Sequence, residues 1–586
     1  MENTLHKSPR PSHSKKILKN IFEIFLSITL IFYSISAKSQ IYTFEVYEKE
    51  IDRLSKMSPL PEFGEFGDSV DMSSGNTTFR KTLIEIKGSN DLRVAADYIF
   101  RLTTPPGGIP HFTMASDIAY IEGTHSSELG WIAGHYPTDY NTNRCSDPRA
   151  LSPLQGAATI RILKPVDNIV PADYWSGNTL YVPGEQGGFV RPISTNESRP
   201  SGVDIKWAVN GEWRFSCYTL PDGSEGFVGH RANGQKYYFG IPVAQQLNAQ
   251  LLSPNRPDVD GWLDVDKFRM YVVRIEDRFG NWVNYSNEKI ISNDGRFIIF
   301  SKSNSNEWLI NATGRQWTIN HNLNPISIFS ITNPDGSKWE FSQTGTLRLI
   351  ESTLHNSCSS QASIPHLYSG QLTAAVKTES GATGTFLLQP RRRGYSNVRF
   401  DCNYAASGHK EGMAYSKIMH FIDEISLISR TTSGPGTTAF THNFDYGPIS
   451  ACYDAKGDPN VPDACTTNSP TTRTTTLTGP NGSIKTFTFG NTYHVNAGLM
   501  LATSHGGFET SSIEYATLYS DSNGAGMTPL GFDMNAYQIN RIKKSTLIRQ
   551  GTRFTLEIPA TCGSGQFCFD EYFRPTKIVR SSNPLP

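Results

Sequence analysis

Arg278-Phe-Gly-Asn-Trp-Val-Asn-Tyr285 is one copy of a short pattern that recurs along this chain and decides its fold. In each copy a Gly-containing turn is followed by a polar residue and then by alternating aromatic or β-branched residues. Asn-Gly or Asp-Gly supplies the positive φ angles of a tight turn, and the period-two run lays one face of a strand against a core. Each copy therefore predicts a β-hairpin. The other copies are at 233–239, 294–300, 313–319, 334–341 and 480–489.

The spacing of these turns predicts one long sheet. Between residues 278 and 341 they recur every 15 to 22 residues, the length of one hairpin. A lone hairpin is marginally stable in water, and stacking lets each one bury its apolar face. We therefore expect an all-β fold, with stacked antiparallel hairpins forming a long curved or spiralling sheet. Further strand-like runs are at 417–430, 437–444, 483–489 and 542–558, and a Thr-rich stretch at 466–478 is expected to be an exposed strand or stalk.

Changes in the residue pattern divide the chain into segments. Two β-favouring runs, 79–86 and 91–102, flank the turn Lys87-Gly-Ser-Asn90, which predicts a hairpin. A short helix is expected at 245–252, and residues 553–558 and 567–573 are expected to form a disulfide-clamped hairpin. The predicted organisation is a signal peptide at 1–39, a lead-in linker at 40–75, a β-rich amino-terminal domain at 76–252, a linker at 253–267 and the hairpin array at 268–586.

The amino terminus has the order of regions found in a secretory signal peptide. Lys15, Lys16 and Lys19 precede an apolar run at 24–35, and the small residues Ala37 and Ser39 offer a cleavage site. The alternative is an uncleaved anchor, but the run is shorter than the ~20 apolar residues that a membrane span needs. We expect a protein that is secreted, periplasmic or on the cell surface, with no stable membrane span after cleavage.

The cysteines fit an exported protein. Their number, 8, is even, and none is in a Cys-x-x-Cys pair, which favours disulfides over a zinc site. Free buried thiols for some of them are the alternative. The expected pairs are sequential along the chain: Cys145–Cys217, Cys358–Cys402, Cys452–Cys465 and Cys562–Cys568.

Charge balance excludes one class of partner. The chain has 54 basic and 54 acidic side chains, so it has no net charge to attract a nucleic acid or an acidic lipid surface. Binding must instead depend on local features.

Three segments resemble the amino-terminal part of bacterial RHS-repeat, or YD-repeat, proteins. They are 66–76, 225–239 and above all Ile275-Glu-Asp-Arg-Phe-Gly-Asn-Trp-Val-Asn-Tyr285. The resemblance covers roughly 60–345 well and the remainder loosely. It implies a β-sheet ribbon that spirals into a hollow shell. In complete family members the shell ends in a core and encloses a carboxy-terminal toxin.

The chain departs from the family pattern in two respects. It has no Asp-Pro-x-Gly-Arg core motif, and the repeat signature Tyr-Asp-x-x-Gly is met only at 453–457. The resemblance therefore implies the front part of such a protein, either truncated or split from its cargo, or a shell fragment that works by itself. Toxin activity is not carried over.

Candidate chemistry is sparse. The chain has no Gly-x-Ser-x-Gly elbow, His-Glu-x-x-His motif or Gly-Lys-Ser/Thr phosphate loop, so we expect no enzyme activity, although a dispersed hydrolase triad leaves no motif. No cofactor is expected. An acidic cluster could present oxygens to calcium, but it lacks the full spacing of an EF-hand loop, and a solvated acidic linker is favoured. Its carboxylates are Asp258, Asp260, Asp264 and Asp266.

Tryptophans follow three of the turns at a similar offset. Trp282, Trp317 and Trp339 could form a ladder on one face of the sheet. If exposed, the ladder could stack on the sugar rings of a cell-surface glycan. Their period-two placement among Val and Phe favours the core instead.

These observations lead to a main hypothesis and two alternatives. The main one is a secreted, non-catalytic structural shell of the RHS type that encloses or presents a protein partner or cargo, such as a toxin module. It predicts a continuous inner cavity wall and an open sheet edge near Pro586, whereas a closed, solid-core sandwich would count against it. A surface adhesin or carbohydrate-binding β protein is the first alternative, and a secreted hydrolase is the second.

Overall fold

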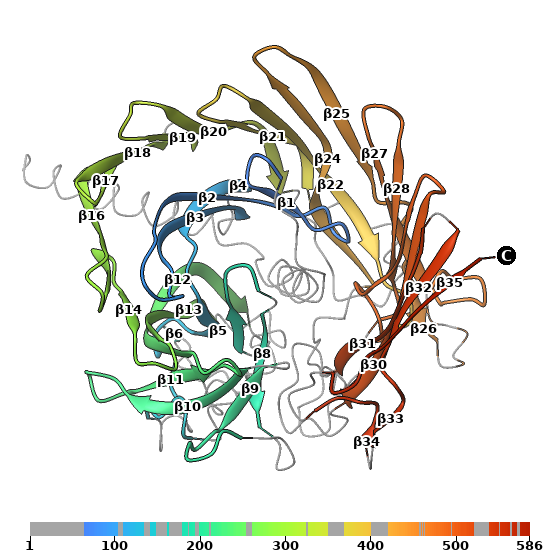
Figure 1. The fold of residues 1–586 in the computed structure, drawn as a ribbon, viewed down its shortest axis with the longest axis horizontal. Coiled ribbons are helices and arrows are strands. Elements are labelled where there is room, and N and C mark those ends of the chain that lie inside the picture. The colour runs from blue at the N-terminus through green and yellow to red at the C-terminus, as the bar shows by residue number, and fades with distance from the viewer. Residues whose placement is uncertain are drawn as a thin grey trace, which may run out of the picture.

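The computed structural model consists of strands joined by turns (Figure 1). It describes residues 64–103, 109–133, 141–147, 161–162, 178–185, 187–193, 199–209, 213–252, 261–323, 326–349, 368–399, 420–455, 457, 459, 461, 463–493, 495–520, 538–549, 551–562, 565–570 and 575–585. Every regular element in these ranges is a β-strand, which confirms the all-β prediction. None of these residues form a helix of the length and hydrophobicity that crossing a membrane requires. The predicted signal peptide lies outside the described residues.

A small antiparallel sheet comes first in the chain. Its strands pair in sequence order, and the turn between the second and third strands includes the predicted 87–90 segment. The strands are β1 (Asp68–Val70), β2 (Thr77–Ile86), β3 (Val94–Thr103) and β4 (His111–Ser116).

The next strands close into a barrel. The ring runs β5-β7-β8-β9-β10-β11-β12-β13 and returns to β5, and β6 adds a short pairing to β13. Buried aromatic and aliphatic side chains fill it, among them Trp213, Phe215 and Phe239. The strands are β5 (Tyr120–Ser126), β6 (Arg161–Ile162), β7 (Asn178–Tyr181), β8 (Gly188–Pro192), β9 (Trp207–Val209), β10 (Trp213–Thr219), β11 (Glu225–His230), β12 (Lys236–Leu252) and β13 (Gly261–Glu276).

One strand joins the barrel to the rest of the sheet. Residues 265–271 of β13 pair with β5 and close the ring, while residues 274–276 of the same strand pair with β14. From β14 onward, each strand of an open antiparallel ribbon pairs with the next. The ribbon consists of β14 (Trp282–Tyr285), β15 (Lys289–Ser292), β16 (Phe297–Asn304), β17 (Glu307–Ala312), β18 (Arg315–Leu323), β19 (Ile326–Thr332), β20 (Lys338–Leu349), β21 (Tyr368–Lys377), β22 (Thr383–Gly394), β24 (Phe421–Gly434), β25 (Thr437–Asp445), β27 (Thr472–Thr478), β28 (Ile484–Gly490), β29 (Met500–His505), β30 (Glu509–Ser520), β31 (Gln538–Arg549), β32 (Thr552–Glu557) and β35 (Val579–Pro584).

The repeated turn pattern sets the hairpins of this ribbon. The glycine of every quoted copy has a positive φ, for example 84° at Gly280 and 88° at Gly295. The strands that follow alternate as expected, since Trp317 and Ile319 on β18 and Trp339 and Phe341 on β20 are buried. The predicted hairpin array is confirmed, and the Thr-rich stretch contains strand β27.

The ribbon curves around the small sheet, as Figure 1 shows for the blue strands inside the arc of β16 to β24. The ring centre of Phe79 on β2 lies 5.2 Å from that of Phe341 and 4.7 Å from that of Phe386. Phe100 of β3 stacks on Phe341 with 4.7 Å between the ring centres. These rings share one buried cluster. Around these rings the inner face of the ribbon therefore packs against a core, which counts against the expected continuous cavity wall.

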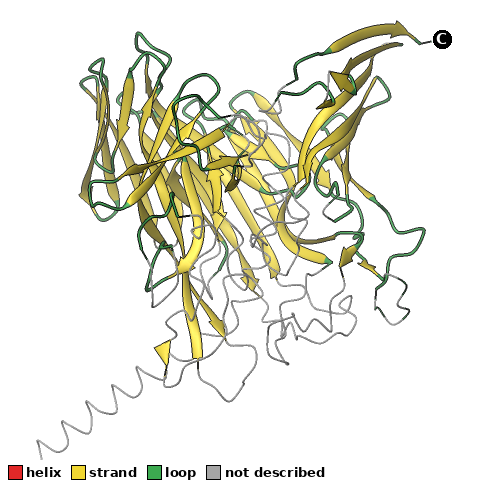
Figure 2. Cartoon of the chain, turned by 90° about the horizontal axis from the view of Figure 1, so that it is seen from below, coloured by secondary structure: helices red, strands yellow, loops and turns green. Residues whose placement is uncertain are grey.

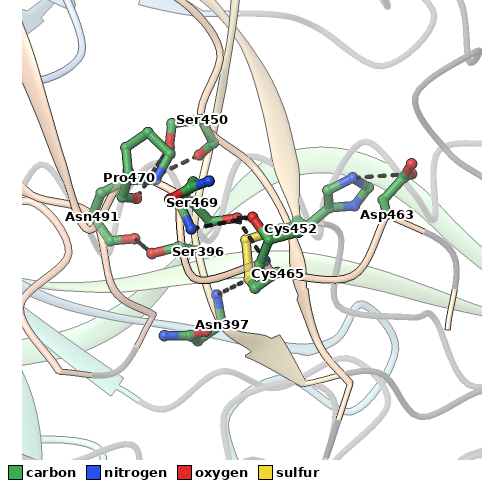
Figure 3. Close-up of a disulfide and its surroundings, with 12 residues drawn as sticks. Ser396, Asn397, Ser450, Cys452, Asp463, Cys465, Ser469, Pro470 and Asn491 are labelled. Carbon is green, nitrogen blue, oxygen red and sulfur yellow. Dashed lines mark hydrogen bonds and ion pairs between the residues drawn. A yellow bond between two sulfur atoms is a disulfide. The ribbon is translucent and has the colours of Figure 1, made fainter. Parts of the chain in front are cut away.

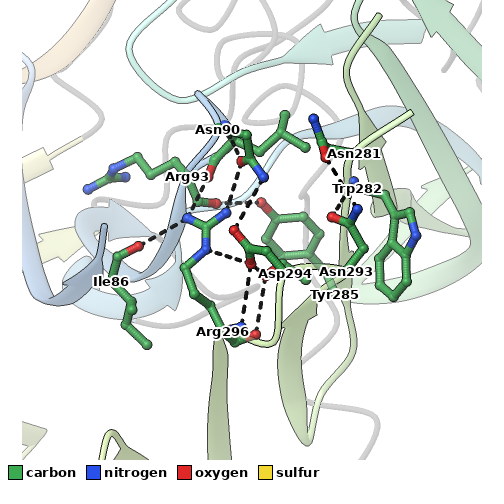
Figure 4. Close-up of polar contacts among 11 residues, drawn as sticks. Ile86, Asn90, Arg93, Asn281, Trp282, Tyr285, Asn293, Asp294 and Arg296 are labelled. Carbon is green, nitrogen blue, oxygen red and sulfur yellow. Dashed lines mark hydrogen bonds and ion pairs between the residues drawn. The ribbon is translucent and has the colours of Figure 1, made fainter. Parts of the chain in front are cut away.

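A turn of the ribbon also holds the small sheet through polar contacts (Figure 4). Arg296 donates hydrogen bonds to the carbonyl oxygens of Ile86 (3.1 Å) and Leu92 (2.9 Å) and to Oδ1 of Asn90 (2.9 Å). Its Nε donates to Oδ1 of Asp294 at 2.8 Å. The Asp-Gly turn found in the sequence thus both reverses the chain and anchors the small sheet.

The structure corrects several boundaries. Residues 245–252 are strand in β12, and the helix prediction is wrong because pairing with the long strand β13 overrides the local sequence. The β-bulges of β12, one of them between Gln245 and Ala249, disturb the period-two pattern that marks a strand. Residues 261–267 of the expected linker also belong to β13.

The lead-in and the clamped hairpin differ from expectation as well. Residues 64–75 are not a linker: they include β1, and Phe66 is buried against Phe386. Residues 553–557 lie in β32, which pairs with β31 and β35 and not with the described residues 567–570, because β31 and β35 offer long complementary edges. The clamp is a smaller unit in which β33 (Thr561–Cys562) pairs with β34 (Gly565–Gln566).

Candidate functional site

We call the last strands of the described ribbon, β31, β32 and β35, the terminal edge. Figure 2 shows its last strand extending outward at one side of the molecule. β35 pairs with β32 through residues 579–584, and no strand among the described residues pairs with its other side. All six residues of β35 are exposed.

The hydrogen-bond register determines which groups of β35 face away from the ribbon. The Leu585 N–H donates to the Gly551 carbonyl at 2.6 Å. Because hydrogen-bonded and non-hydrogen-bonded pairs alternate in an antiparallel ladder, Asn583, Ser581 and Val579 also face β32. Arg580 and Ser582 therefore direct their backbone N–H and C=O groups outward, where another strand could pair with them.

Apolar side chains accompany this edge. Four of them have side chains that are 41–46% exposed: Ile542, Phe554, Ile578 and Val579. Exposed β-branched and aromatic residues beside an unpaired strand are the surface that a further strand would cover. Pro584 occupies the third outward position and has no N–H to donate. Only Arg580 and Ser582 can therefore donate hydrogen bonds to an added strand.

Disulfides stabilise three places in the fold. Cys145–Cys217, Cys452–Cys465 and Cys562–Cys568 are formed, which confirms three of the four expected pairs, and Cys358 and Cys402 lie outside the described residues. They indicate an oxidising, extracytoplasmic environment. The third clamps the segment between β32 and β35 and so stands next to the terminal edge.

The Cys452–Cys465 loop is tied to its neighbours by polar contacts (Figure 3). Asn491 Nδ2 donates to the Ser450 carbonyl at 2.9 Å, and the Asn397 N–H donates to Cys465 Sγ at 3.1 Å. The single Tyr-Asp-x-x-Gly match begins here, where β26 (Tyr453–Asp454) pairs in parallel with β23 (Val398–Arg399). This signature therefore lies in a disulfide-linked loop and not in a ribbon hairpin.

One Ser–His contact, which the sequence patterns did not reveal, bears on hydrolysis. Ser216 Oγ and His230 Nε2 are 2.7 Å apart on β10 and β11. Burial and the charge of Lys236 lower the pKa of His230 to about 4, so it is a poor base at neutral pH. Among the described residues no carboxylate bonds to His230 to orient it, and the pair lacks the third member of a triad.

Half of the acidic cluster lies outside the described residues, so the calcium site stays a prediction. Asp258 and Asp260 lie outside them. Asp264 and Asp266 are on β13, where Asp266 is half-buried opposite His125 of β5. Elsewhere in the described ranges, no group of three or more His, Cys, Asp or Glu side chains has metal-binding geometry.

The three tryptophans do not form an exposed ladder. Trp339 is 2% exposed and Trp317 is 7% exposed, so both belong to the core under the ribbon and a sugar ring has no access to their faces. Trp282 is half-buried, and the guanidinium of Arg274 lies 4.9 Å from its ring centre.

Comparisons with known proteins do not assign a family. No family model and no curated protein matches the chain. Among solved structures, the N-terminal domain of effector protein SpvB from Salmonella typhimurium strain LT2 aligns at 11% identity over 62% of this chain and 94% of that chain, with a TM-score of 0.09. That score does not establish a shared fold.

Proposed function

We propose that the chain is a secreted, non-catalytic scaffold segment of an RHS-type shell, which encloses or presents a partner polypeptide. The observation that carries the proposal is the terminal edge: β35 has paired backbone groups on one side and, among the described residues, unpaired ones on the other. Strand addition to such an edge uses main-chain hydrogen bonds for affinity and side-chain contacts for specificity.

Differences in burial along the ribbon support this role. Ribbon strands β20 and β22 pack against the small sheet through Trp339, Phe341 and Phe386. Side chains of β32 and β35, in contrast, are half-buried or exposed on both faces. A partner would find uncovered sheet at this end, beside exposed apolar side chains such as Phe554.

The glycan-binding alternative has less support. It needs exposed aromatic rings, and two of the three candidate rings are in the core. The hydrolase alternative is likewise weakened by the low pKa of His230 and by its surroundings.

A pair of proline variants tests strand addition. The protein is produced together with the polypeptide encoded immediately downstream, and association is followed by co-purification and by protection of that polypeptide from protease. Ser582→Pro removes an outward N–H without touching the ladder to β32, so it should abolish association and leave the fold intact. The matched variant Ser581→Pro removes an inward bond and should instead loosen β35 itself.

The proposal predicts association for the natural chain and its loss in Ser582→Pro. A natural chain that leaves the downstream polypeptide free and fully cleavable contradicts it. Binding to a glycan panel, detected by a change in tryptophan fluorescence, would favour the adhesin alternative.

A further inference from the structure

A cleft lies between the small sheet and the inner face of the ribbon. It opens partly to solvent, and its volume together with the solvent space at its mouth is about 370 Å³. One wall is the loop after β1, which includes Ser73. The opposite wall carries Arg393 of β22, Glu424 of β24, Arg473 of β27 and Asn491.

The loop that forms the first wall is fixed in place by the ribbon. Ser426 Oγ donates to the Ser74 carbonyl at 2.6 Å, and Thr475 Oγ1 donates to the Met72 carbonyl at 2.6 Å. Gly75 has a φ of 77°, and a Cβ there would lie 2.5 Å from Ser426 and from the Tyr446 hydroxyl. The cleft is therefore preformed and does not depend on a mobile lid.

Charge in the cleft is unevenly paired. Arg392 forms two hydrogen bonds to Asp423, at 2.7 and 2.8 Å, and Arg393 donates to Glu424 at 2.6 Å. Arg391 has a longer contact of 3.5 Å to Asp445. Arg473 forms no ion pair with any described residue. The remaining carboxylate nearby, Asp71, accepts hydrogen bonds from the Ser73 N–H and the Ser74 hydroxyl.

Several donors in this cleft also lack acceptors. Nε and Nη2 of Arg473, Nη1 of Arg393 and the hydroxyl of Ser73 have no hydrogen-bond partner among the described residues. Arg393 is 9% exposed and Ser73 is 3% exposed. Two acceptors on the same wall lack hydrogen bonds: Oδ1 of Asn491, whose Nδ2 is held by Ser450 (Figure 3), and Oε2 of Glu424, which forms an ion pair with Nε of Arg393. Unpaired buried donors are costly, and here donors outnumber acceptors.

Arg473 keeps its charge in this setting. Burial and the neighbouring Arg393 lower its pKa to about 10, so it remains protonated at neutral pH. Its ring contact, with the guanidinium 6.0 Å from the centre of Phe489, does not neutralise it. Glu424 and Asp71 attract this charge, and the neighbouring Arg393 opposes it.

We propose that this cleft binds a small oxyanion, either a phosphate or a carboxylate group, through the unpaired N–H groups of Arg473 and Arg393 and the Ser73 hydroxyl. The planar guanidinium fork matches two oxygens of such a group, and a charged acceptor would satisfy donors that the protein leaves open. A cation is disfavoured by the two arginines, and an apolar ligand would leave the donors unsatisfied.

Titration of the whole chain with two anions tests the proposal. Inorganic phosphate and acetate are added separately at constant ionic strength set with chloride, and binding is measured by isothermal calorimetry and by the shift in melting temperature. We expect one saturable site for at least one of the two anions, and the comparison between them distinguishes a phosphate from a carboxylate ligand. The natural chain binding neither anion beyond the chloride background overturns the proposal.

Three variants locate the site. Arg473→Gln should weaken binding about ten- to a hundredfold, the usual value of a hydrogen bond to a charged group. Arg315→Gln, at an exposed ribbon position outside the cleft, should bind like the natural chain. If Arg473→Gln fails to fold, the milder Ser73→Ala should still lose about two- to tenfold. Unchanged affinity in a folded Arg473→Gln or in Ser73→Ala would place the anion elsewhere and overturn the assignment.

Discussion

The barrel and the ribbon are built from the same local hairpins but end differently. In the barrel, β13 pairs with β12 on one edge and with β5 on the other, so the sheet has no free edge and its interior is filled by aromatic residues such as Phe215. In the ribbon, pairing continues in one direction until β35, whose outer side is open among the described residues. The same turn chemistry, with Gly234 at 87° and Gly280 at 84°, operates in both. Closure is therefore decided by long-range pairing and not by the turns.

The largest loss of stability is expected when an aromatic ring is removed from the core under the ribbon. Phe79 is fully buried and contacts Phe112, Phe341 and Phe386. Phe79→Ala should lower the free energy of unfolding by about 4 kcal/mol, because it leaves a cavity between the small sheet and the ribbon. Urea denaturation followed by circular dichroism measures this loss.

The matched control is at the terminal edge. Phe554 is 45% exposed, and Phe554→Ala should change the free energy of unfolding of the isolated chain by no more than about 0.5 kcal/mol. Equal losses in the two variants would show that the terminal edge is as well packed as the core, against the distinction drawn here.

Removal of each disulfide is expected to give the next largest differences in the free energy of unfolding. The bridged residues are 72, 13 and 6 positions apart for Cys145–Cys217, Cys452–Cys465 and Cys562–Cys568. Loop-closure entropy predicts losses of about 4, 3 and 2 kcal/mol, respectively, when each pair is replaced by alanine. Thermal unfolding of the three double variants checks the order, and a larger loss at the terminal clamp than in the barrel would reverse it.

The smallest expected effect concerns pH. The side chain of Arg296, followed by the Ser292 hydroxyl, lowers the pKa of Asp294 to about 2. A depressed folded-state pKa stabilises the protein above the unfolded value of about 3.9, and the contribution is lost as pH falls toward 2. Asp294→Asn should remove about 1 kcal/mol of this pH-dependent stability, allowing for solvent screening.

Unfolding titrations between pH 5 and pH 2 measure this effect. Asp335→Asn is the control, because hydrogen bonds from Ser337 and from the local backbone, without an arginine, lower the pKa of Asp335 at an equivalent ribbon turn. If Asp335→Asn removed more of the pH-dependent stability than Asp294→Asn, this would contradict the role given to Arg296.

Local features of this fold were predictable from sequence, and long-range ones were not. Gly280, Gly295 and Gly336 mark turns because their conformation depends on the residues beside them. The barrel depends on β13 meeting β5, which is more than a hundred positions earlier in the chain, and no short-range pattern encodes that contact. The position of the small sheet inside the ribbon was missed for the same reason.

The cleft is only partly visible in the local sequence. Arg391, Arg392 and Arg393 form a run of charge inside a strand, which is unusual for a half-buried sheet. That run is a local signal. Its meeting with Arg473 and Ser73 is not, because these residues come from three distant segments that only the folded ribbon brings together.

Hydrogen exchange at the terminal edge tests the central claim most directly. Residue-resolved exchange of the Arg580 and Ser582 amides is measured in the chain alone and with the polypeptide encoded immediately downstream. We expect fast exchange of both amides in the free chain, while barrel amides such as Val228 stay protected, and marked slowing of both when the partner is added. Rates for Arg580 and Ser582 that are unchanged by the partner, or as slow as those of the barrel in the free chain, would contradict the claim that this edge is an open site for strand addition.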